Sequence, residues 1–316
     1  MKKQIVTASL FITSILFAGC QATNDSKEPT NEKKPTIVTT FYPMYEFTKE
    51  VAGDDANISM LIPASVEPHD WEPTAKDLEK IQRSDALVFN NENMETWVEE
   101  VKNAVDSKDL HMIDASNGIK LLPFSSGNHE AEEHEEEEHE HTHEFDPHLW
   151  LSPKMAIKEV RNIAEKLIEI DPAHKNDYLK NKQNYIKKLE NLDKDYTIAF
   201  EKVSNKEIIT QHAAFGYLAD SYGLKQVPIA GLSPENEPSA KKLKELKVFA
   251  KKHSIQTIFF EENASSKVAK TLANELHAKT AVLNTLEGLS EEEQEKGEDY
   301  IKIMEKNLDV LKEVLN

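Results

Sequence analysis

Short apolar runs alternate with longer helical patterns from residue 36 onwards, and this alternation limits the fold more than any other feature of the sequence. In the first half, four runs rich in β-branched or apolar residues predict buried strands at 36–41, 57–62, 86–90 and 110–114. Helical patterns lie between these runs, at 44–52, 76–83 and 95–105. Strands and helices in alternation are typical of parallel βα units. We therefore expect a mostly parallel sheet flanked by helices in this half of the chain.

A long helical pattern occupies the middle of the chain, from His174 to Val203. Its apolar positions recur every three to four residues, at Tyr178, Tyr185, Leu189, Leu192, Tyr196 and Phe200. At 1.5 Å per residue such a helix is roughly 45 Å long, which is more than one small lobe requires. We therefore expect it to bridge two lobes. A shorter helix precedes it, opened by Pro153 and ended at Asp171-Pro172.

The alternation resumes after the long helix. Four further strands are predicted at 207–211, 225–229, 256–261 and 279–283, and the chain closes on a helix with apolar positions at Ile301, Met304, Leu308, Leu311 and Leu315. The predicted fold is α/β, with two lobes that each hold a four-stranded, mostly parallel sheet and flanking helices. The N-terminal lobe is expected to span 36–173, the linking helix 174–203 and the C-terminal lobe 204–316.

Residues 1–19 are interpreted as a signal peptide. Two lysines begin the segment, an apolar run spans 5–17, and small residues precede Cys20. The apolar run is shorter than the about 20 residues that a membrane-spanning helix needs. The arrangement resembles a bacterial lipoprotein signal, in which Cys20 becomes the lipidated first residue of the mature chain. The alternative is a secreted protein whose single cysteine occurs there by chance. Residues 20–35 are polar and lack periodicity, which predicts a flexible tether.

Residues 125–145 are interpreted as a disordered loop rich in histidine and glutamate. The run 129–144 contains five histidines and nine glutamates, which cannot build an apolar core. Imidazoles and carboxylates both bind divalent cations, so the loop predicts an auxiliary, low-affinity metal site. Its histidines are His129, His134, His139, His141 and His143. The net charge of −19 favours cations as ligands and argues against binding to nucleic acid.

Four potential metal ligands stand just past predicted strands or in loops at the same side. They are His69, His148, His212 and Glu287. In open α/β sheets, ligands bind at the carboxyl ends of the strands, and two of the four residues come from each half of the chain. Three neutral imidazoles and one carboxylate form a tetrahedral set that zinc accepts. Taken singly, each residue is more often a structural or solvated group, so the hypothesis requires that all four meet between the lobes.

Other polar residues near these positions receive a plainer interpretation. The acids beside the candidate ligands are expected to support them or to lie at the surface: Glu67, Asp70, Glu72 and Asp146. The remaining histidines fall in helix or strand patterns and are expected to be ordinary: His111, His174, His253 and His277.

Several long motifs carry a resemblance to a known family. They are TTFYPMYEFTKEVAG, PASVEPHDWEPT, the His/Glu-rich run, DPHLWLSP, ITQHAAFGYLADSYGL, PIAGLSPENEPSAKKL, FFEENASSKVAKTLA and VLNTLEGLS. On these motifs, which cover nearly all of residues 36–316, the chain resembles the zinc-binding lipoproteins of bacterial high-affinity zinc-uptake ABC transporters. These lipoproteins belong to the metal-binding cluster A-I of solute-binding proteins, the bacterial solute-binding protein 9 family.

The resemblance implies specific ligands, a fold and a function. The metal ligands would be His69, His148 and His212, with Glu287 in the fourth place and Glu261 and Glu262 as alternatives to it. The fold would be two lobes joined by one rigid helix. The function would be that of a receptor and not an enzyme. Such a receptor is lipid-anchored at the outer face of the cell membrane, captures Zn²⁺ in the interlobe cleft and delivers it to an ABC permease driven by its ATPase. We also expect a monomer.

Three other functions stay open on the sequence. Residues 139–143 match the H-E-x-x-H signature of zinc proteases, but that signature works on a helix and here stands in a His/Glu-rich loop. A manganese carrier of the same fold would use more oxygen ligands, and in related manganese carriers an acidic residue takes the place of His212. The third is a passive extracellular zinc buffer or an adhesin without a transporter, which no feature of the sequence excludes.

Overall fold

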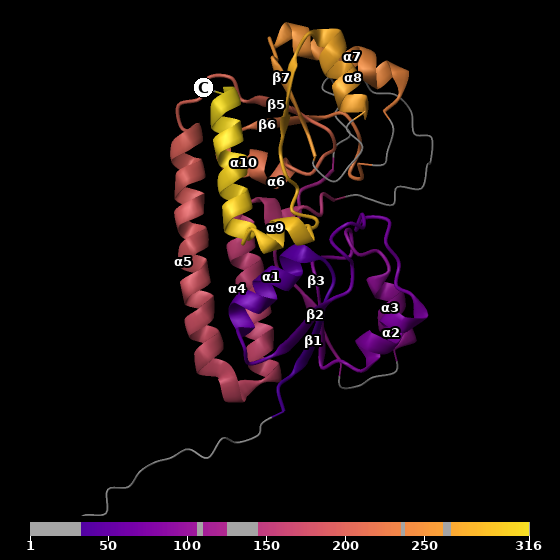
Figure 1. Ribbon diagram of the computed structural model, residues 1–316, viewed down its shortest axis with the longest axis vertical. Helices are drawn as coiled ribbons and strands as arrows, with labels where there is room; N and C mark the ends of the chain where they lie inside the picture. Colours follow the sequence, from indigo (N-terminus) through magenta and orange to yellow (C-terminus); the bar gives the residue numbers. More distant parts are fainter. Residues whose placement is uncertain (1–32, 106–109, 125–144, 235–237, 262–266, 316) are drawn as a thin grey trace, which may run out of the picture. The chain divides into compact units, whose positions relative to one another are not determined.

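The computed structural model describes residues 33–105, 110–124, 145–234, 238–261 and 267–315 (Figure 1). The signal peptide, Cys20, the run 129–144 and Glu262 lie outside these residues. Across the described ranges, no helix combines the length and the apolar character that crossing a membrane requires.

The first sheet is built from four parallel strands in the order β2-β1-β3-β4. Their bounds are β1 Thr36–Thr39, β2 Asn57–Met60, β3 Ala86–Phe89 and β4 His111–Asp114. The connecting helices are α1 Tyr42–Ala52, α2 Ala75–Gln82 and α3 Val98–Ala104. The central strands β1 and β3 are apolar on both faces because helices cover a parallel sheet from both sides. Ile37 and Val38 are accordingly both fully buried.

The second sheet repeats this arrangement with the order β6-β5-β7-β8, again wholly parallel. Its strands are β5 Glu207–Thr210, β6 Lys225–Pro228, β7 Thr257–Phe260 and β8 Lys279–Val282. The connecting helices are α6 Gly216–Tyr222, α7 Ala240–Lys252 and α8 Lys267–Leu276. Successive side chains of a strand point to opposite faces. Ile208 therefore joins the large hydrophobic core, whereas Ile209 joins a smaller cluster beneath α7 and α8.

Long helices connect the two lobes. The chain leaves the first lobe through a 3-10 turn, η1 Leu149–Leu151, then α4 Pro153–Ile170 and a second turn, η2 Pro172–His174. Helix α5, Lys175–Phe200, follows with 26 residues and is about 39 Å long. It packs against α1 and α4 and also against α6 and α10, so it contacts elements of both lobes.

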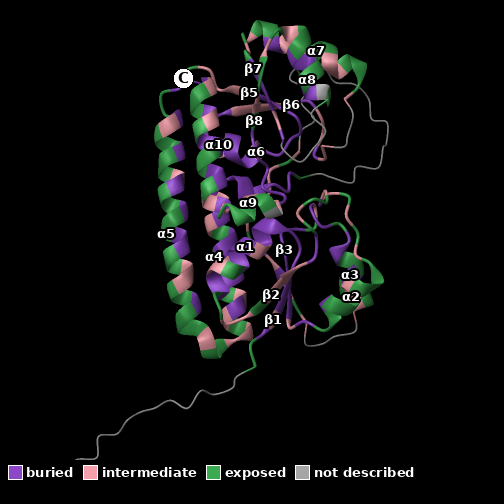
Figure 2. Cartoon of the chain, viewed as in Figure 1, coloured by how far each residue is buried: buried purple, intermediate pink, exposed green. Residues whose placement is uncertain are grey.

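Helix α5 buries the apolar positions that the sequence pattern predicts. Tyr178, Tyr185, Leu189, Leu192, Tyr196 and Phe200 are all buried. Figure 2 shows exposed residues on the remaining surface of this helix. The chain ends with α9 Glu291–Glu295 and α10 Tyr300–Leu315, and α10 lies beside α5 (Figure 1). The predicted α/β fold of two lobes with four-stranded sheets is confirmed.

One helix begins later than its sequence pattern predicts. Helix α3 starts at Val98 and not at Glu95. The Glu95 carboxylate is fully buried and accepts hydrogen bonds from the backbone N–H groups of Asn90 and Asn91, at 3.0 and 3.1 Å, and from Thr40 Oγ1 at 2.6 Å. These bonds hold the segment after β3 in a turn, which delays the helix by three residues.

Candidate metal centre

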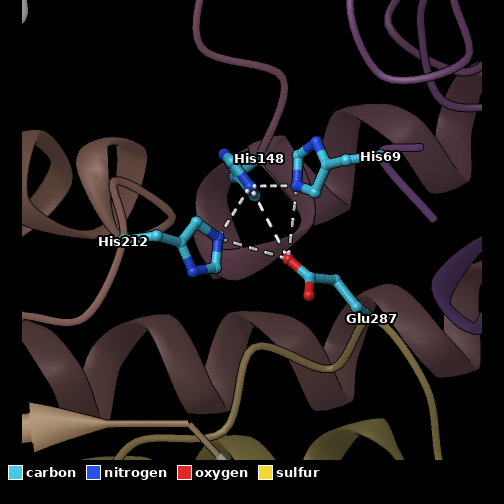
Figure 3. A group of neighbouring side chains, drawn as sticks. All are labelled: His69, His148, His212 and Glu287. Atoms are coloured by element: carbon cyan, nitrogen blue, oxygen red, sulfur yellow. Dashed lines mark hydrogen bonds and ion pairs between the residues drawn. The ribbon is translucent and has the colours of Figure 1, made fainter. Parts of the chain in front are cut away.

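Four side chains from four separate segments point toward one another between the lobes (Figure 3). They are His69, His148, His212 and Glu287, and one ligand atom from each lies within 4.8 Å of all the others. The sequence analysis names the same four residues. Among the described residues this is the group of histidine and acidic side chains that could hold a metal ion.

The fold delivers two of these residues from each lobe. His69 stands in the loop after β2, and His148 immediately precedes the η1 turn. His212 follows β5 by two residues, and Glu287 lies in the loop after β8. The carboxyl ends of both parallel sheets therefore face the same site, which is where α/β sheets bind ligands.

Five of the six distances between the ligand atoms are close to those of a tetrahedral zinc site, and all six are within 4.8 Å. With bonds of about 2.0–2.1 Å, the donor atoms around tetrahedral zinc lie about 3.3–3.4 Å apart. Nε2 of His148 lies 3.1 Å from Nε2 of His69 and 3.3 Å from Nε2 of His212. Oε1 of Glu287 lies 3.6, 3.6 and 3.4 Å from the Nε2 atoms of His69, His148 and His212. A cation of this size therefore fits at the centre of the group.

His148 is held by an acid two residues before it. Asp146 Oδ1 accepts hydrogen bonds from the backbone N–H of His148 at 2.9 Å and from its ring Nδ1 at 2.8 Å. This partner assigns the ring proton to Nδ1 and leaves the Nε2 lone pair facing the site. Full burial lowers the pKa of His148 to about 4, against the opposing effect of Asp146, so this imidazole is neutral and ready to bind a metal.

His212 is held in the same way by Glu261. Glu261 Oε1 accepts hydrogen bonds from the backbone N–H of His212 at 3.2 Å and from its ring Nδ1 at 2.5 Å. Glu261 therefore lies on the Nδ1 side of the His212 ring, opposite the Nε2 atom that faces the other three side chains. Burial lowers the pKa of His212, but the charges of Glu261 and Glu287 outweigh burial and raise this pKa well above its ordinary value. A metal that binds Nε2 must therefore displace a proton from this ring.

His69 has a weaker support than the other two histidines. Its backbone N–H donates to Glu67 Oε1 at 3.2 Å. Burial and the nearby charge of Glu287 raise the pKa of Glu67 to about 8. Glu67 is thus a protonated neighbour at neutral pH, which keeps a further negative charge away from the site.

Glu287 is ionised although it is buried. Burial alone would raise its pKa, but His212 and His69 lower it below its usual range. Within the described residues, its Oε1 atom is buried without a hydrogen-bond partner. A buried carboxylate oxygen without a donor is costly unless a cation satisfies it.

Sequence reasoning missed two sets of supporting contacts. The side-chain amides of Asn90 and Asn91 both donate to the carbonyl of Pro147, at 2.7 and 3.3 Å. The Tyr217 hydroxyl donates to the carbonyl of Asp146 at 2.9 Å and also accepts from the N–H of Leu122 at 2.9 Å. These partners lie 57, 56, 71 and 95 positions away in the chain, so no local pattern indicates them. The support that Asp146 gives to His148 could be predicted from the sequence, because Asp146 is an acid two residues before a candidate ligand.

The other histidines in the described residues lie away from this group. His174 Nδ1 pairs with Asp171 at 2.6 Å, and His253 Nδ1 pairs with Glu207 at 3.0 Å. Their partners are acids of helix or strand ends, as expected for ordinary structural residues.

Comparison with known proteins places the chain in a family. A family model described as zinc-uptake complex component A, periplasmic (ZnuA), matches residues 37–314. The chain belongs to this family. The resemblance found in the sequence motifs is therefore confirmed.

Individual relatives of this zinc-uptake family match over most of the chain. The high-affinity zinc uptake system protein ZnuA of Bacillus subtilis (strain 168) is 54% identical over 303 residues, which are 95% of this chain and 94% of that protein. The zinc-binding lipoprotein AdcA of Streptococcus pneumoniae (strain ATCC BAA-255 / R6) is 49% identical over 305 residues, which are 96% of this chain but 60% of AdcA. The crystal structure of the Zn(II)-bound ZnuA-like domain of Streptococcus pneumoniae AdcA matches with a TM-score of 0.77 and 49% identity, and covers 90% of this chain and 99% of that one.

Proposed function

We propose that this protein is an extracytoplasmic zinc receptor that captures Zn²⁺ between its two lobes and delivers it to an ABC permease for import. The observation that carries the proposal is that three imidazole nitrogens and one carboxylate oxygen lie within 4.8 Å of one another, with five of the six distances at 3.1–3.6 Å. Zinc is the transported ligand, and the metal ligands are His69, His148, His212 and Glu287. Relatives that are named zinc-uptake and zinc-binding proteins support this assignment.

Zinc fits these ligands better than manganese does. Manganese prefers oxygen donors, whereas this group offers three nitrogens and one carboxylate oxygen. The Nδ1 protons of His148 and His212 are bound to carboxylates, which makes both rings stronger ligands through Nε2. The site therefore favours a divalent metal of borderline softness and tetrahedral geometry.

Cys20 would anchor the receptor to the membrane. The lipoprotein-like signal at 1–19 precedes it, and AdcA of Streptococcus pneumoniae is named a lipoprotein. In this proposal Cys20 carries fatty acyl chains such as palmitate, the segment 20–35 is the tether, and the folded lobes lie at the outer face of the cell membrane. The partners are the permease and, through it, the ATPase, and the receptor itself acts as a monomer.

The His/Glu-rich segment would serve as an auxiliary collector of zinc. Its described ends lie together, because Pro123 and Phe145 form an antiparallel bridge and Asp146 N–H donates to Leu122 O at 2.8 Å. Asp146 is the residue that holds His148, so the segment starts and returns next to the proposed centre. His129, His134, His139, His141 and His143 would bind zinc weakly there and raise its local concentration.

The alternative functions have less support. The matched family is described as a zinc-uptake component, so the H-E-x-x-H match at 139–143 has no support as a peptidase site. The same family description gives no support to a passive zinc buffer or to an adhesin without a transporter. Deletion of the gene separates these cases, since a receptor for import is required for growth at low zinc and added zinc restores that growth.

Metal analysis of the purified protein tests the proposal directly. Protein prepared without added metal should contain about one tightly held zinc per chain, as a single tetrahedral site predicts. His148→Ala should remove it, whereas His253→Ala should retain it, because His253 pairs with Glu207 away from the site. Protein that carries no zinc, or that keeps it after His148→Ala, would refute the proposed centre.

A further inference from the structure

The loop that carries Glu287 is held by a residue of helix α10. The side chain of Asn307 makes two hydrogen bonds to the backbone of Asn284: Nδ2 donates to the carbonyl at 2.8 Å, and Oδ1 accepts from the N–H at 2.9 Å. Asn307 is 3% exposed, so water does not compete for these bonds. The Asn307 amide thereby makes the two hydrogen bonds that a neighbouring strand would otherwise make with the backbone just after β8.

The held loop contains a strained residue directly before Glu287. Leu286 has a φ of +56°, in the left-handed region that residues other than glycine rarely adopt. Asn284 Oδ1 accepts a hydrogen bond from the Leu286 N–H at 2.7 Å, and the Leu286 side chain is fully buried. Such a conformation is unfavourable and persists only where surrounding contacts impose it. The pair Asn307–Asn284 is one of these contacts.

The first lobe contacts the same loop from the other side. Trp150 Nε1 donates to the carbonyl of Thr285 at 2.8 Å. Gly288 packs so closely that an added Cβ would lie 2.2 Å from the carbonyl oxygen of Ala64, in the loop that leads to His69. Glu287 thus stands between contacts to the first lobe and the anchor on α10.

We propose that Asn307 is a positioning residue that holds Glu287 in reach of the three histidines and thereby sets how slowly the metal leaves. The inference rests on the proposed function, because it takes Glu287 to be a metal ligand. Without Asn307, the strained turn at Leu286 loses its anchor on the second lobe, and the carboxylate moves away from the nitrogen atoms it faces. His148 and His212 are held by other residues, Asp146 and Glu261, and stay in place.

Zinc release measured with a fast chelator tests this role. Asn307→Ala should speed zinc dissociation by about 10- to 100-fold, the factor by which metal affinity falls when a residue that orients a metal ligand is removed. Asn162→Ala is the matched control, because Asn162 also ties a helix to backbone carbonyls, those of Ala115 and Asn117 at 2.8 Å each, but does not touch the Glu287 loop. Its dissociation rate should equal that of the unaltered protein. Asn307→Asp keeps the size and the acceptor but loses the donor, and it should show the same acceleration. This variant carries the test if Asn307→Ala folds poorly.

A double substitution separates positioning from general loosening. If Asn307 acts through Glu287, then Asn307→Ala should add nothing to the rate already reached by Glu287→Ala, because the two changes remove the same ligand. The proposal would be overturned if Asn307→Ala speeded zinc dissociation equally in the unaltered protein and in Glu287→Ala. It would also be overturned if Asn307→Ala and Asn307→Asp both left the dissociation rate unchanged.

Metal-free protein gives a readout that does not depend on zinc. Asn307→Ala should speed hydrogen exchange of the Trp150 indole N–H, which is bonded to Thr285, and Asn162→Ala should not. An unchanged indole exchange rate would show that Asn307 does not hold the loop. Faster exchange in a protein that binds no tight zinc would instead refute the proposed function and leave the loop anchor standing.

Discussion

Asp146 Oδ1 accepts both the backbone N–H and the ring Nδ1–H of His148, at 2.9 and 2.8 Å. In the other lobe, Glu261 Oε1 makes the same pair of contacts to His212. Each lobe therefore supplies one histidine whose rotation and tautomer are set by a single carboxylate oxygen. This arrangement aims both Nε2 atoms at the metal position before the metal arrives, which removes part of the ordering that binding would otherwise require.

Asp146→Asn should weaken zinc binding by about 10-fold, at the lower end of the range for such partners, because the amide keeps the size but loses the negative charge. Asp146→Ala should weaken it further. Competition titration with a zinc chelator measures both. Asp220→Asn, at an exposed position of α6, is the control and should leave the affinity unchanged. Equal affinities for Asp146→Ala and the unaltered protein would show that Asp146 does not orient His148.

His212→Glu should shift the metal preference from zinc toward manganese. The change replaces a nitrogen by an oxygen ligand and adds a negative charge, so zinc affinity should fall by orders of magnitude while manganese affinity falls much less or rises. The new carboxylate would face Glu261, which lies 2.5 Å from His212 Nδ1, and the two buried charges would repel each other. The substitution is therefore best tested together with Glu261→Gln, by competition titrations with both metals. A variant that keeps its zinc preference would show that His212 does not bind the metal.

Gly288→Ala should weaken zinc binding by separating the lobes where Gly288 packs against the backbone of Ala64. The added methyl would lie 2.2 Å from the carbonyl oxygen of Ala64, and a backbone atom has no rotamer through which to escape. Overpacking of this kind costs about 1–3 kcal/mol, which should appear in the zinc affinity as well as in stability. In Gly118→Ala the new methyl meets nothing within 4 Å, although the φ of +71° is strained for alanine. That control should lower stability and leave zinc affinity unchanged; the same affinity in both variants would contradict the prediction.

Glu159→Gln should stabilise the metal-free protein at pH 8 but not at pH 5. Glu159 is fully buried, both of its oxygens lack a hydrogen-bond partner among the described residues, and burial raises its pKa from 4.5 to about 8. Between these two values the unfolded chain is ionised at this position and the folded chain is protonated. The stability contributed by the raised pKa is therefore complete below pH 4.5 and is lost as the pH rises toward 8. For a buried group this loss is on the order of 5 kcal/mol.

Denaturant unfolding of both proteins at pH 5 and pH 8 measures this effect. The free energy of unfolding of Glu159→Gln relative to the unaltered protein should increase with pH, since glutamine does not titrate. Every other titrating group is common to the two proteins and cancels in the difference. A difference that stays constant between the two pH values would show that Glu159 is ionised in the folded state.

Cys20→Ser should release the protein from the membrane fraction into the medium. Acyl chains contribute about 0.8 kcal/mol per buried methylene, so the loss of the lipidated cysteine removes the anchor. Cell fractionation followed by immunodetection measures the distribution. Lys2→Gln is a control that leaves the cysteine in place and should stay with the membrane. Retention of Cys20→Ser in the membrane fraction would refute the lipid anchor.

The local sequence pattern determined the order of the strands and helices and the places where candidate metal ligands stand. The alternation of apolar runs and helical periods specifies the βα order of both lobes, and the buried stripe from Tyr178 to Phe200 specifies the long helix α5. Ligand-type residues just past strands, such as His212 after β5, already indicate where a metal would bind. These features depend on neighbours a few positions away, which is why the sequence alone reveals them.

Tertiary structure explains why Glu287, and not Glu261, faces the three histidines. Glu261 and Glu287 both follow a strand of the same sheet, so position along the chain does not separate them. The difference comes from contacts between distant segments: Glu261 bonds to His212, 49 positions away, and Asn307 holds the Glu287 loop from 23 positions away. The left-handed backbone of Leu286 turns the following carboxylate toward the histidines, and no local preference of leucine predicts that conformation. Side-chain direction at a loop depends on what packs against it from elsewhere in the fold, and that information exists only once the chain has folded.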